Sequence, residues 1–167
     1  MNESYVECLV AKKAGPLDIF LKGLLIAVVA ICIILGLFSG SIVIMILAIA
    51  LGFGAYFLIP MFDIEYEYLY LDREITIDKI MSKQRRKRMA VYDLGKMELL
   101  APETSHEFDS YKARNVKVRD FSSNMPDHKA YLMAYHDEKE ECLVKFEPNE
   151  EMIKCIKQIA MRKVRDY

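Results

Sequence analysis

The sequence predicts an α+β membrane protein, in which a two-helix transmembrane hairpin precedes a small antiparallel β-barrel or sandwich of about seven strands, capped by a C-terminal α-helix. Three observations lead to this prediction. No Asp, Glu, Lys or Arg occurs between Gly23 and Phe62 of the 167-residue chain. From Asp63 onward, short segments with strand periodicity alternate with turn residues. The last segment has helical periodicity instead.

The uncharged segment is long enough for two membrane crossings. A bilayer core of about 30 Å is spanned by about 20 apolar helical residues. The forty residues 23–62 would form a helical rod of about 60 Å at roughly 1.5 Å per residue. We therefore expect a transmembrane hairpin at residues 17–60, with spans at 17–37 and 42–60. Pro60 ends the second span, because proline lacks the N–H group that a helix requires.

The distribution of Lys and Arg predicts a multi-pass protein of the cell membrane with both termini in the cytoplasm. Lys12, Lys13 and Lys22 precede or begin the first span, a basic run at residues 83–88 follows the second, and the connecting loop is uncharged. Positively charged residues favour the cytoplasmic side. A cleaved signal peptide is the alternative, but acidic residues precede the apolar segment and a second span follows at once.

The second span carries small residues at a spacing of four, in the pairs Ala48–Gly52 and Ala50–Gly54. Small residues on one helical face allow a partner helix to approach closely. Packing against the first span is the favoured interpretation, and dimerisation is the alternative. No Asp, Glu, Lys, Arg or His lies within residues 23–62, so we expect an anchor and no proton or ion path.

The parts outside the membrane are a cytoplasmic N-terminal segment, residues 1–16, and a cytoplasmic domain, residues 63–167. Just over a hundred residues are enough for one domain with its own core. The cysteines have no metal-ligand spacing, and we expect all of them to be reduced, with no metal and no cofactor. They are Cys8, Cys32, Cys142 and Cys155.

Seven segments of the domain have the composition and periodicity of strands. In the first, Ile64, Tyr66 and Tyr68 alternate with Glu65 and Glu67. The others are expected at 74–81, 86–92, 97–101, 115–121, 130–136 and 141–146. A helix is expected at 149–165, with Asn149 as its N-cap. About seven antiparallel strands closed by a C-terminal helix describe a pleckstrin-homology-like (PH-like) domain.

The chain also resembles a family of short bacterial membrane proteins whose domain has no assigned function. The resemblance covers most of the chain, and it implies a transmembrane hairpin with a PH-like cytoplasmic domain. It implies no activity and no functional residues. The matching stretches are Asn2-Glu-Ser-Tyr, Asp63-Ile-Glu-Tyr-Glu-Tyr-Leu, Ile77-Asp-Lys-Ile-Met, Ala101-Pro-Glu, Asp109-Ser-Tyr-Lys, Val118-Arg-Asp-Phe-Ser-Ser and Phe146-Glu-Pro-Asn-Glu.

The candidate site is the basic run. If the first strand leads away from the bilayer and the second returns antiparallel, the turn that carries the run lies beside the membrane. Anionic headgroups attract juxtamembrane cations by about 1 kcal/mol each. One hypothesis is therefore contact with anionic lipid or a phosphorylated headgroup, and the other is a solvated hairpin that serves topology and solubility. The residues are Lys83, Arg85, Arg86, Lys87 and Arg88.

Other features give weaker indications. We do not expect nucleic-acid binding, because no aromatic residue interleaves the cations. His106, His128 and His136 are far apart in the sequence, and we expect surface histidines instead of metal ligands. The loop 102–112 is long for a small barrel. It is either a partner-binding edge or a short helix over an open barrel seam.

These observations favour a non-enzymatic, membrane-anchored binding module that docks on anionic lipid or on a membrane protein partner. The alternative is an accessory or structural subunit of a membrane complex that interacts through its hairpin. An enzyme is the least favoured class, because the sequence contains no nucleophile motif or phosphate-binding glycine loop and suggests no catalytic residues.

Overall fold

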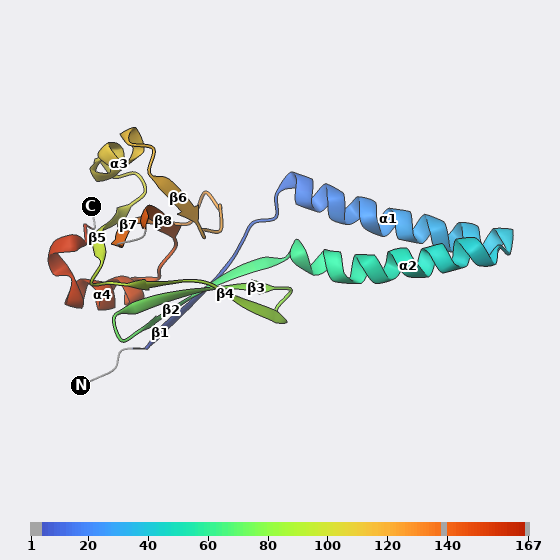
Figure 1. The fold of residues 1–167 in the computed structure, drawn as a ribbon, viewed down its shortest axis with the longest axis horizontal. Coiled ribbons are helices and arrows are strands. Elements are labelled where there is room, and N and C mark those ends of the chain that lie inside the picture. Colours follow the sequence, from blue (N-terminus) through green and yellow to red (C-terminus); the bar gives the residue numbers. More distant parts are fainter. Residues whose placement is uncertain (1–4, 138–139, 166–167) are drawn as a thin grey trace. The chain divides into compact units, whose positions relative to one another are not determined.

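The computed structural model describes residues 5–137 and 140–165. The chain divides into two compact units. Residues 14–64 and 81–85 form a helical unit, and the other described residues form a sheet unit. Figure 1 shows the paired helices of the first unit and the strands of the second.

Two apolar helices, α1 (Pro16–Ser39) and α2 (Ile42–Leu58), form an antiparallel hairpin. At the start of α1 the Asp18 carboxylate accepts a hydrogen bond from the Gly15 N–H at 3.0 Å, which caps the helix. Its C-terminal cap is Gly40 with φ of 61°, a left-handed conformation that glycine adopts without strain. The helical segments Pro16–Ser39 and Ile42–Met61, with mean hydropathies of 2.8 and 2.7, are long and apolar enough to cross a membrane.

Small residues bring the two helices together. A Cβ atom on Gly36 would lie 3.1 Å from the Met45 sulfur, so the helices approach closely near the turn. Ala48 is buried, and Gly52 faces Val29 of α1. The pair Ala48–Gly52 therefore packs within the chain, as the favoured interpretation of the sequence expected.

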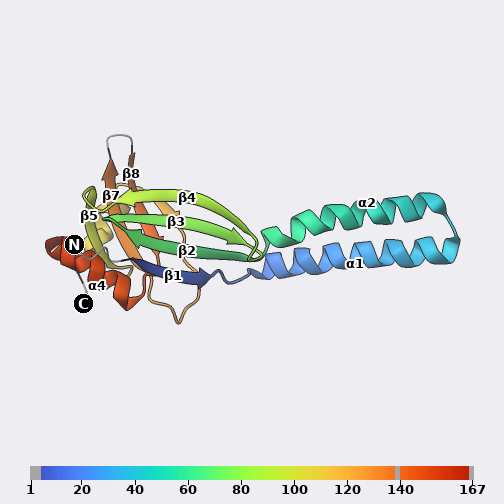
Figure 2. The same ribbon diagram turned by 90° about the horizontal axis from the view of Figure 1, so that it is seen from below.

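The sheet unit is a sandwich of two four-stranded sheets, with no closed barrel among the described residues. All seven expected strands are present, and an eighth joins them. Sheet A has the order β1 (Val6–Ala11), β2 (Ile64–Leu71), β3 (Glu74–Met81) and β4 (Arg85–Asp93), which lie side by side in Figure 2. Sheet B has the order β5 (Met97–Pro102), β7 (Tyr131–Asp137), β8 (Glu140–Phe146) and β6 (Lys117–Asp120), with β6 parallel to β8.

Strand β1 lies where only an N-terminal segment was expected. It pairs antiparallel with β2, from Val6 opposite Tyr70 to Ala11 opposite Glu65. Val6 and Val10 are buried in the sandwich. The segment 1–16 therefore contains an edge strand of the fold.

Aromatic side chains join the inner faces of the two sheets. Their rings meet edge to face, which is a favourable geometry for aromatic pairs. The Tyr68 hydroxyl also donates a hydrogen bond of 2.6 Å to the Phe121 carbonyl. The pairs are Tyr66–Phe121, Tyr68–Phe146 and Tyr92–Tyr135, with centroid distances of 5.7, 5.6 and 4.9 Å.

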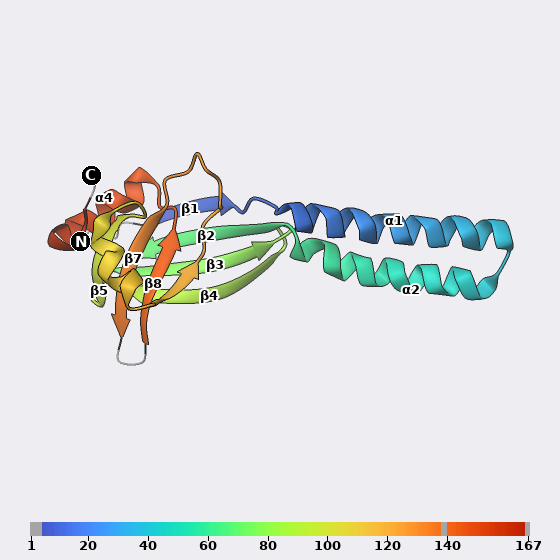
Figure 3. The same cartoon turned by 90° about the horizontal axis from the view of Figure 1, so that it is seen from above.

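The outer face of sheet B is covered by the loop that follows β5. This loop contains the short helices η2 (His106–Phe108) and α3 (Asp109–Ala113), visible beside β7 and β8 in Figure 3. Of the two alternatives for this loop, the structure therefore shows a short helix, which covers a sheet face in place of a barrel seam. Phe108 is fully buried against Ala101, Leu132, Ala134 and Leu143.

The C-terminal helix α4 (Glu150–Ile159) is shorter than the expected 149–165. Asn149 caps it as expected, since its side chain accepts a hydrogen bond of 2.8 Å from the Met152 N–H. After Ala160 the backbone leaves the helix, and Val164 forms a parallel bridge with Leu100 of β5. Pairing with sheet B thus replaces the last helical turns. Helix α4 itself packs against β1.

Candidate functional site

The turn that carries the basic run lies beside the end of α2. The Ser82 N–H donates a hydrogen bond of 2.8 Å to the carbonyl of Asp63, which follows the helix. The Arg85 guanidinium lies over the ring of Phe57, 5.6 Å from its centroid. Ser82 and Lys83 both have positive φ, as a tight turn between two strands requires. Within the helical unit, Lys83 and Arg85 are therefore held at the α2 terminus.

A small cavity opens between this turn and the helix end. It has a volume of about 240 Å³ and is lined by Tyr56, Ile59 and Pro60 on one side and by Met81 and Arg85 on the other. Tyrosine and arginine at the end of an apolar helix are typical of the membrane–water interface, because both have an apolar body and a polar tip. The cavity thus combines an apolar wall with one guanidinium.

Arg86 and Arg88 belong instead to the surface of sheet A. Arg86 forms an ion pair with Glu67, and its Nε lies 3.8 Å from Asp78 Oδ2. Arg88 Nε lies 3.7 Å from Asp78 Oδ1. Glu67 and Asp78 are each only 3% exposed. A buried carboxylate requires a partner, and the two arginines supply it.

The pKa of Glu67 depends on its burial and on the charged groups beside it. Burial raises the pKa of Glu67, the nearby Arg86 guanidinium opposes that shift, and the neighbouring Glu7 carboxylate adds to it. The predicted five-residue site is therefore divided in the structure. Arg86 and Arg88 face carboxylates of the sheet, whereas Lys83, Arg85 and Lys87 form no ion pair within the described part of the chain.

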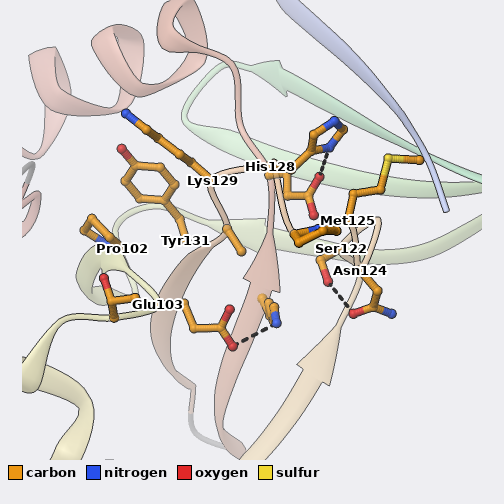
Figure 4. Close-up of a pocket in the computed structure, with 13 residues that line it drawn as sticks. Pro102, Glu103, Ser122, Asn124, Met125, His128, Lys129 and Tyr131 are labelled. Carbon is orange, nitrogen blue, oxygen red and sulfur yellow. Dashed lines mark hydrogen bonds and ion pairs between the residues drawn. The ribbon is translucent and has the colours of Figure 1, made fainter. Parts of the chain in front are cut away.

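A second and larger cavity lies in the sheet unit, with a volume of about 670 Å³. Figure 4 shows its lining, which comes from the end of β5, from the loop 121–130 and from β8. The Lys145 ammonium and the Glu103 carboxylate form an ion pair of 2.8 Å in its wall. No pattern in the sequence predicts this cavity.

Glu147 fixes the loop that lines the larger cavity. Its Oε1 accepts hydrogen bonds of 2.8 Å from both the backbone N–H and the hydroxyl of Ser123. Its Oε2 lies 2.8 Å from His128 Nδ1. The Ser123 carbonyl in turn accepts a hydrogen bond of 2.8 Å from the Lys13 N–H, just after β1. His128 is a surface residue, as the sequence predicts, and it also belongs to a network around a buried carboxylate.

This Ser–His–Glu group is not arranged as a catalytic triad. A triad places the serine and the carboxylate on opposite nitrogens of the imidazole, so that one nitrogen takes the serine proton while the carboxylate holds the N–H of the other. Here Ser123 Oγ, at 3.2 Å, and Glu147 both approach Nδ1 of His128. Ser123 is also fully buried, so a substrate cannot reach its hydroxyl. The group holds the loop in place.

The remaining candidates do not form a site. His106 is exposed and lies 3.3 Å from Asp109, and His136 is exposed on β7. No group of three His, Cys, Asp or Glu side chains in the described residues is suited to hold a metal ion. All four cysteines are free thiols in the structure.

One signal in the sequence could have led to the Glu147 network. Ser123 and Glu147 belong to the stretches Val118–Ser123 and Phe146–Glu150, two of the segments that carry the family resemblance. Strand and helix periodicity explains neither residue. A polar residue that belongs to a stretch shared with the family, but to no helix or strand pattern, indicates a tertiary contact. The structure is needed to identify that contact.

Comparison with known proteins gives one match. A family model described as a bacterial PH-like domain matches residues 2–166, which includes both apolar helices and both sheets. No curated protein and no solved structure matches the chain.

Proposed function

Because the chain belongs to the bacterial PH-like domain family, whose fold generally serves as a non-catalytic binding module, we propose that it is a membrane-anchored binding module that contacts anionic lipid headgroups through Lys83 and Arg85. In this proposal α1 and α2 span the cell membrane and both termini lie in the cytoplasm. The excess of Lys and Arg on the two flanks of the hairpin supports that orientation.

The observation that carries the proposal is the attachment of the basic turn to the end of α2. The Ser82–Asp63 hydrogen bond and the position of Arg85 over Phe57 hold the turn against the end of α2, which in this proposal is where the helix leaves the bilayer. An anionic leaflet attracts cations within a Debye length, which is about 8 Å at physiological salt. Lys83 and Arg85 meet this condition when α2 spans the membrane.

The division of the basic run makes the proposal specific. Arg86 and Arg88 are directed at Glu67 and Asp78, so their charge is largely compensated inside the sheet unit. Lys83 and Arg85 have no such compensation among the described residues. We therefore assign the headgroup contact to these two residues of the five that the sequence suggested.

Lipid retention by the full-length protein tests the proposal. The protein is reconstituted into nanodiscs of phosphatidylcholine with a minority of phosphatidylglycerol, released, and analysed by native mass spectrometry for bound lipid. Lys83→Gln/Arg85→Gln should reduce the preference for phosphatidylglycerol by roughly thirtyfold, because each juxtamembrane cation contributes about 1 kcal/mol and every 1.4 kcal/mol is a factor of about ten. The preference should also weaken as salt is raised.

A control variant with the same change in net charge tests whether the effect depends on where the cations lie. Lys112→Gln/Arg162→Gln removes one lysine and one arginine that are exposed in the sheet unit, and it should retain phosphatidylglycerol like the parent protein. Equal retention by all three proteins would refute the assignment and leave the run as a topology signal. A protein partner that co-purifies in stoichiometric amount, with no lipid preference, would favour the accessory-subunit alternative.

A further inference from the structure

The small cavity at the end of α2 has the size and the lining of a binding site for one small polar group. It lies wholly within the helical unit and has a volume of about 240 Å³. Pockets for drug-sized molecules begin at roughly 300 Å³, so this cavity suits a smaller group. The Tyr56 hydroxyl, the Ser82 hydroxyl and the Gln84 amide belong to its lining, and none of them forms a hydrogen bond with another described residue. These groups are therefore available to a ligand.

The charge of this cavity favours an anion. Arg85 is the one charged side chain among the described residues that line it. The helical unit contains two carboxylates, and both are engaged elsewhere. Asp18 caps α1, and Asp63 forms an ion pair of 3.0 Å with Lys22. The Arg85 guanidinium therefore has no anionic partner within the described part of the chain.

The turn that supplies the polar lining is fixed before a ligand arrives. The Ser82 N–H donates a hydrogen bond of 2.8 Å to the Asp63 carbonyl, and the Gln84 N–H donates one of 3.2 Å to the Met81 carbonyl. Both backbone groups are thus occupied, whereas the side chains of the same two residues remain available. A preformed site of this kind lowers the entropic cost of binding.

The lining distinguishes between classes of phospholipid headgroup. A zwitterionic headgroup brings an ammonium group together with its phosphate, and in this cavity the ammonium would meet a guanidinium and no carboxylate. A headgroup that ends in hydroxyls needs hydrogen-bond partners instead. A serine hydroxyl and a glutamine amide can each donate and accept. Ser82 and Gln84 therefore match a hydroxylated headgroup.

We propose that this cavity selects anionic phospholipids whose headgroup carries hydroxyls beyond a single phosphodiester, as a glycerol headgroup does. Arg85 binds the phosphate, and Ser82 and Gln84 form hydrogen bonds with the headgroup hydroxyls. Ile59 and Pro60 contact the less polar ester region of the lipid. The proposed function supplies the attraction between charges, and this inference, which rests on it, adds recognition of the hydroxyls.

Phosphatidylglycerol and phosphatidylpropanol test the proposal, because both have a phosphodiester charge and a three-carbon headgroup but only the first has headgroup hydroxyls. Full-length protein is reconstituted into phosphatidylcholine nanodiscs with equal minor fractions of the two lipids, and retained lipid is identified by native mass spectrometry. Phosphatidylglycerol should be retained about fivefold over phosphatidylpropanol, since a hydrogen bond contributes a factor of roughly two to ten. Both should be retained over phosphatidylcholine.

A double variant removes the recognition of hydroxyls and keeps the charge. Ser82→Ala/Gln84→Met should bring the ratio of the two anionic lipids close to one, and both should stay preferred over phosphatidylcholine because the cations of the turn remain. That remaining preference also shows that the variant is inserted and folded. Ser110→Ala/Gln158→Met, the same change at exposed positions of the sheet unit, should keep the ratio of the parent protein.

The outcomes separate this inference from the proposed function. Equal retention of the two anionic lipids by the parent protein, both above phosphatidylcholine, would overturn the recognition of hydroxyls and leave the charge contact standing. Equal retention of all three lipids would refute both. An unchanged ratio in Ser82→Ala/Gln84→Met would overturn the assignment to this cavity. Loss of phosphatidylglycerol on addition of excess glycerol phosphate would assign the cavity to a soluble ligand instead of a lipid.

Discussion

The outer faces of the two sheets are protected from water in different ways. Sheet B is covered by a layer of its own chain, in which Phe108 of η2 is fully buried against β5, β7 and β8. Sheet A carries the buried carboxylates Glu67 and Asp78, covered by the long side chains of Arg86 and Arg88. One face is protected by apolar packing and the other by compensated charge. Apolar packing depends little on pH and salt, whereas compensated charge depends on both.

The largest expected effect is on the face of sheet B. Phe108→Ala removes a fully buried ring and leaves a cavity under η2, so the free energy of unfolding should fall by about 3–5 kcal/mol. Near-ultraviolet circular dichroism of the full-length protein is a suitable measurement. There is no tryptophan, and of the ten tyrosines only Tyr56 falls in the helical unit. Tyr111→Phe, which removes only an exposed hydrogen bond to Glu98, serves as control and should cost less than about 1 kcal/mol.

A smaller loss is expected on the face of sheet A. Arg86→Gln leaves the buried Glu67 carboxylate without its main partner and should reduce the free energy of unfolding by about 2 kcal/mol, since Arg86 is itself half exposed. Glu67→Gln/Arg86→Gln removes both charges and should recover most of that loss in the same assay. Lys87→Gln, at the neighbouring cation that forms no ion pair with any described residue, should change little. If the double variant were as unstable as Arg86→Gln, the ion pair would not explain the loss.

The smallest expected effect is on the pH dependence of the free energy of unfolding, which should differ between the two sheet faces. Because the pKa of Glu67 is raised above its ordinary value of 4.5, the folded protein holds this proton more tightly than the unfolded chain does. The contribution of Glu67 to stability is therefore greatest below pH 4.5 and is lost as the pH rises through the raised pKa. Glu67→Gln should make the decrease of stability from pH 4.5 toward neutral shallower. Phe108→Ala and Glu151→Gln should keep the slope of the parent, and equal slopes in all variants would contradict this assignment.

Local patterns predicted the fold class and seven of the strands, because alternation and turn residues are properties of neighbouring residues. Strand β1 was missed even though Val6 and Val10 have strand spacing. Its partner β2 lies beyond the whole hairpin, and nothing local indicates such a distant pairing. The end of α4 was misplaced for a related reason. Val164 continues the helical spacing in sequence, but the pairing with Leu100 draws the chain into an extended conformation.

The candidate site was predicted only in part. The run of cations marked the turn, and antiparallel geometry placed that turn beside the end of α2. The sequence could not show that Arg86 and Arg88 face Glu67 and Asp78, because this depends on the register of three strands. The larger cavity combines residues from three separate segments. No single segment shows charge, spacing or composition that would indicate it.

The basic run has a different electrostatic character before and after folding. If the second apolar segment enters the bilayer before sheet A forms, all five positive charges of residues 83–88 are available to hold this end in the cytoplasm in the proposed orientation. Once β2, β3 and β4 pair, Glu67 and Asp78 compensate two of these charges. The orientation of the protein would then be decided by five positive charges, of which the folded sheet compensates two. A substitution such as Arg88→Gln would therefore weaken the orientation signal during membrane insertion, and it would also remove a partner of Asp78 in the folded protein.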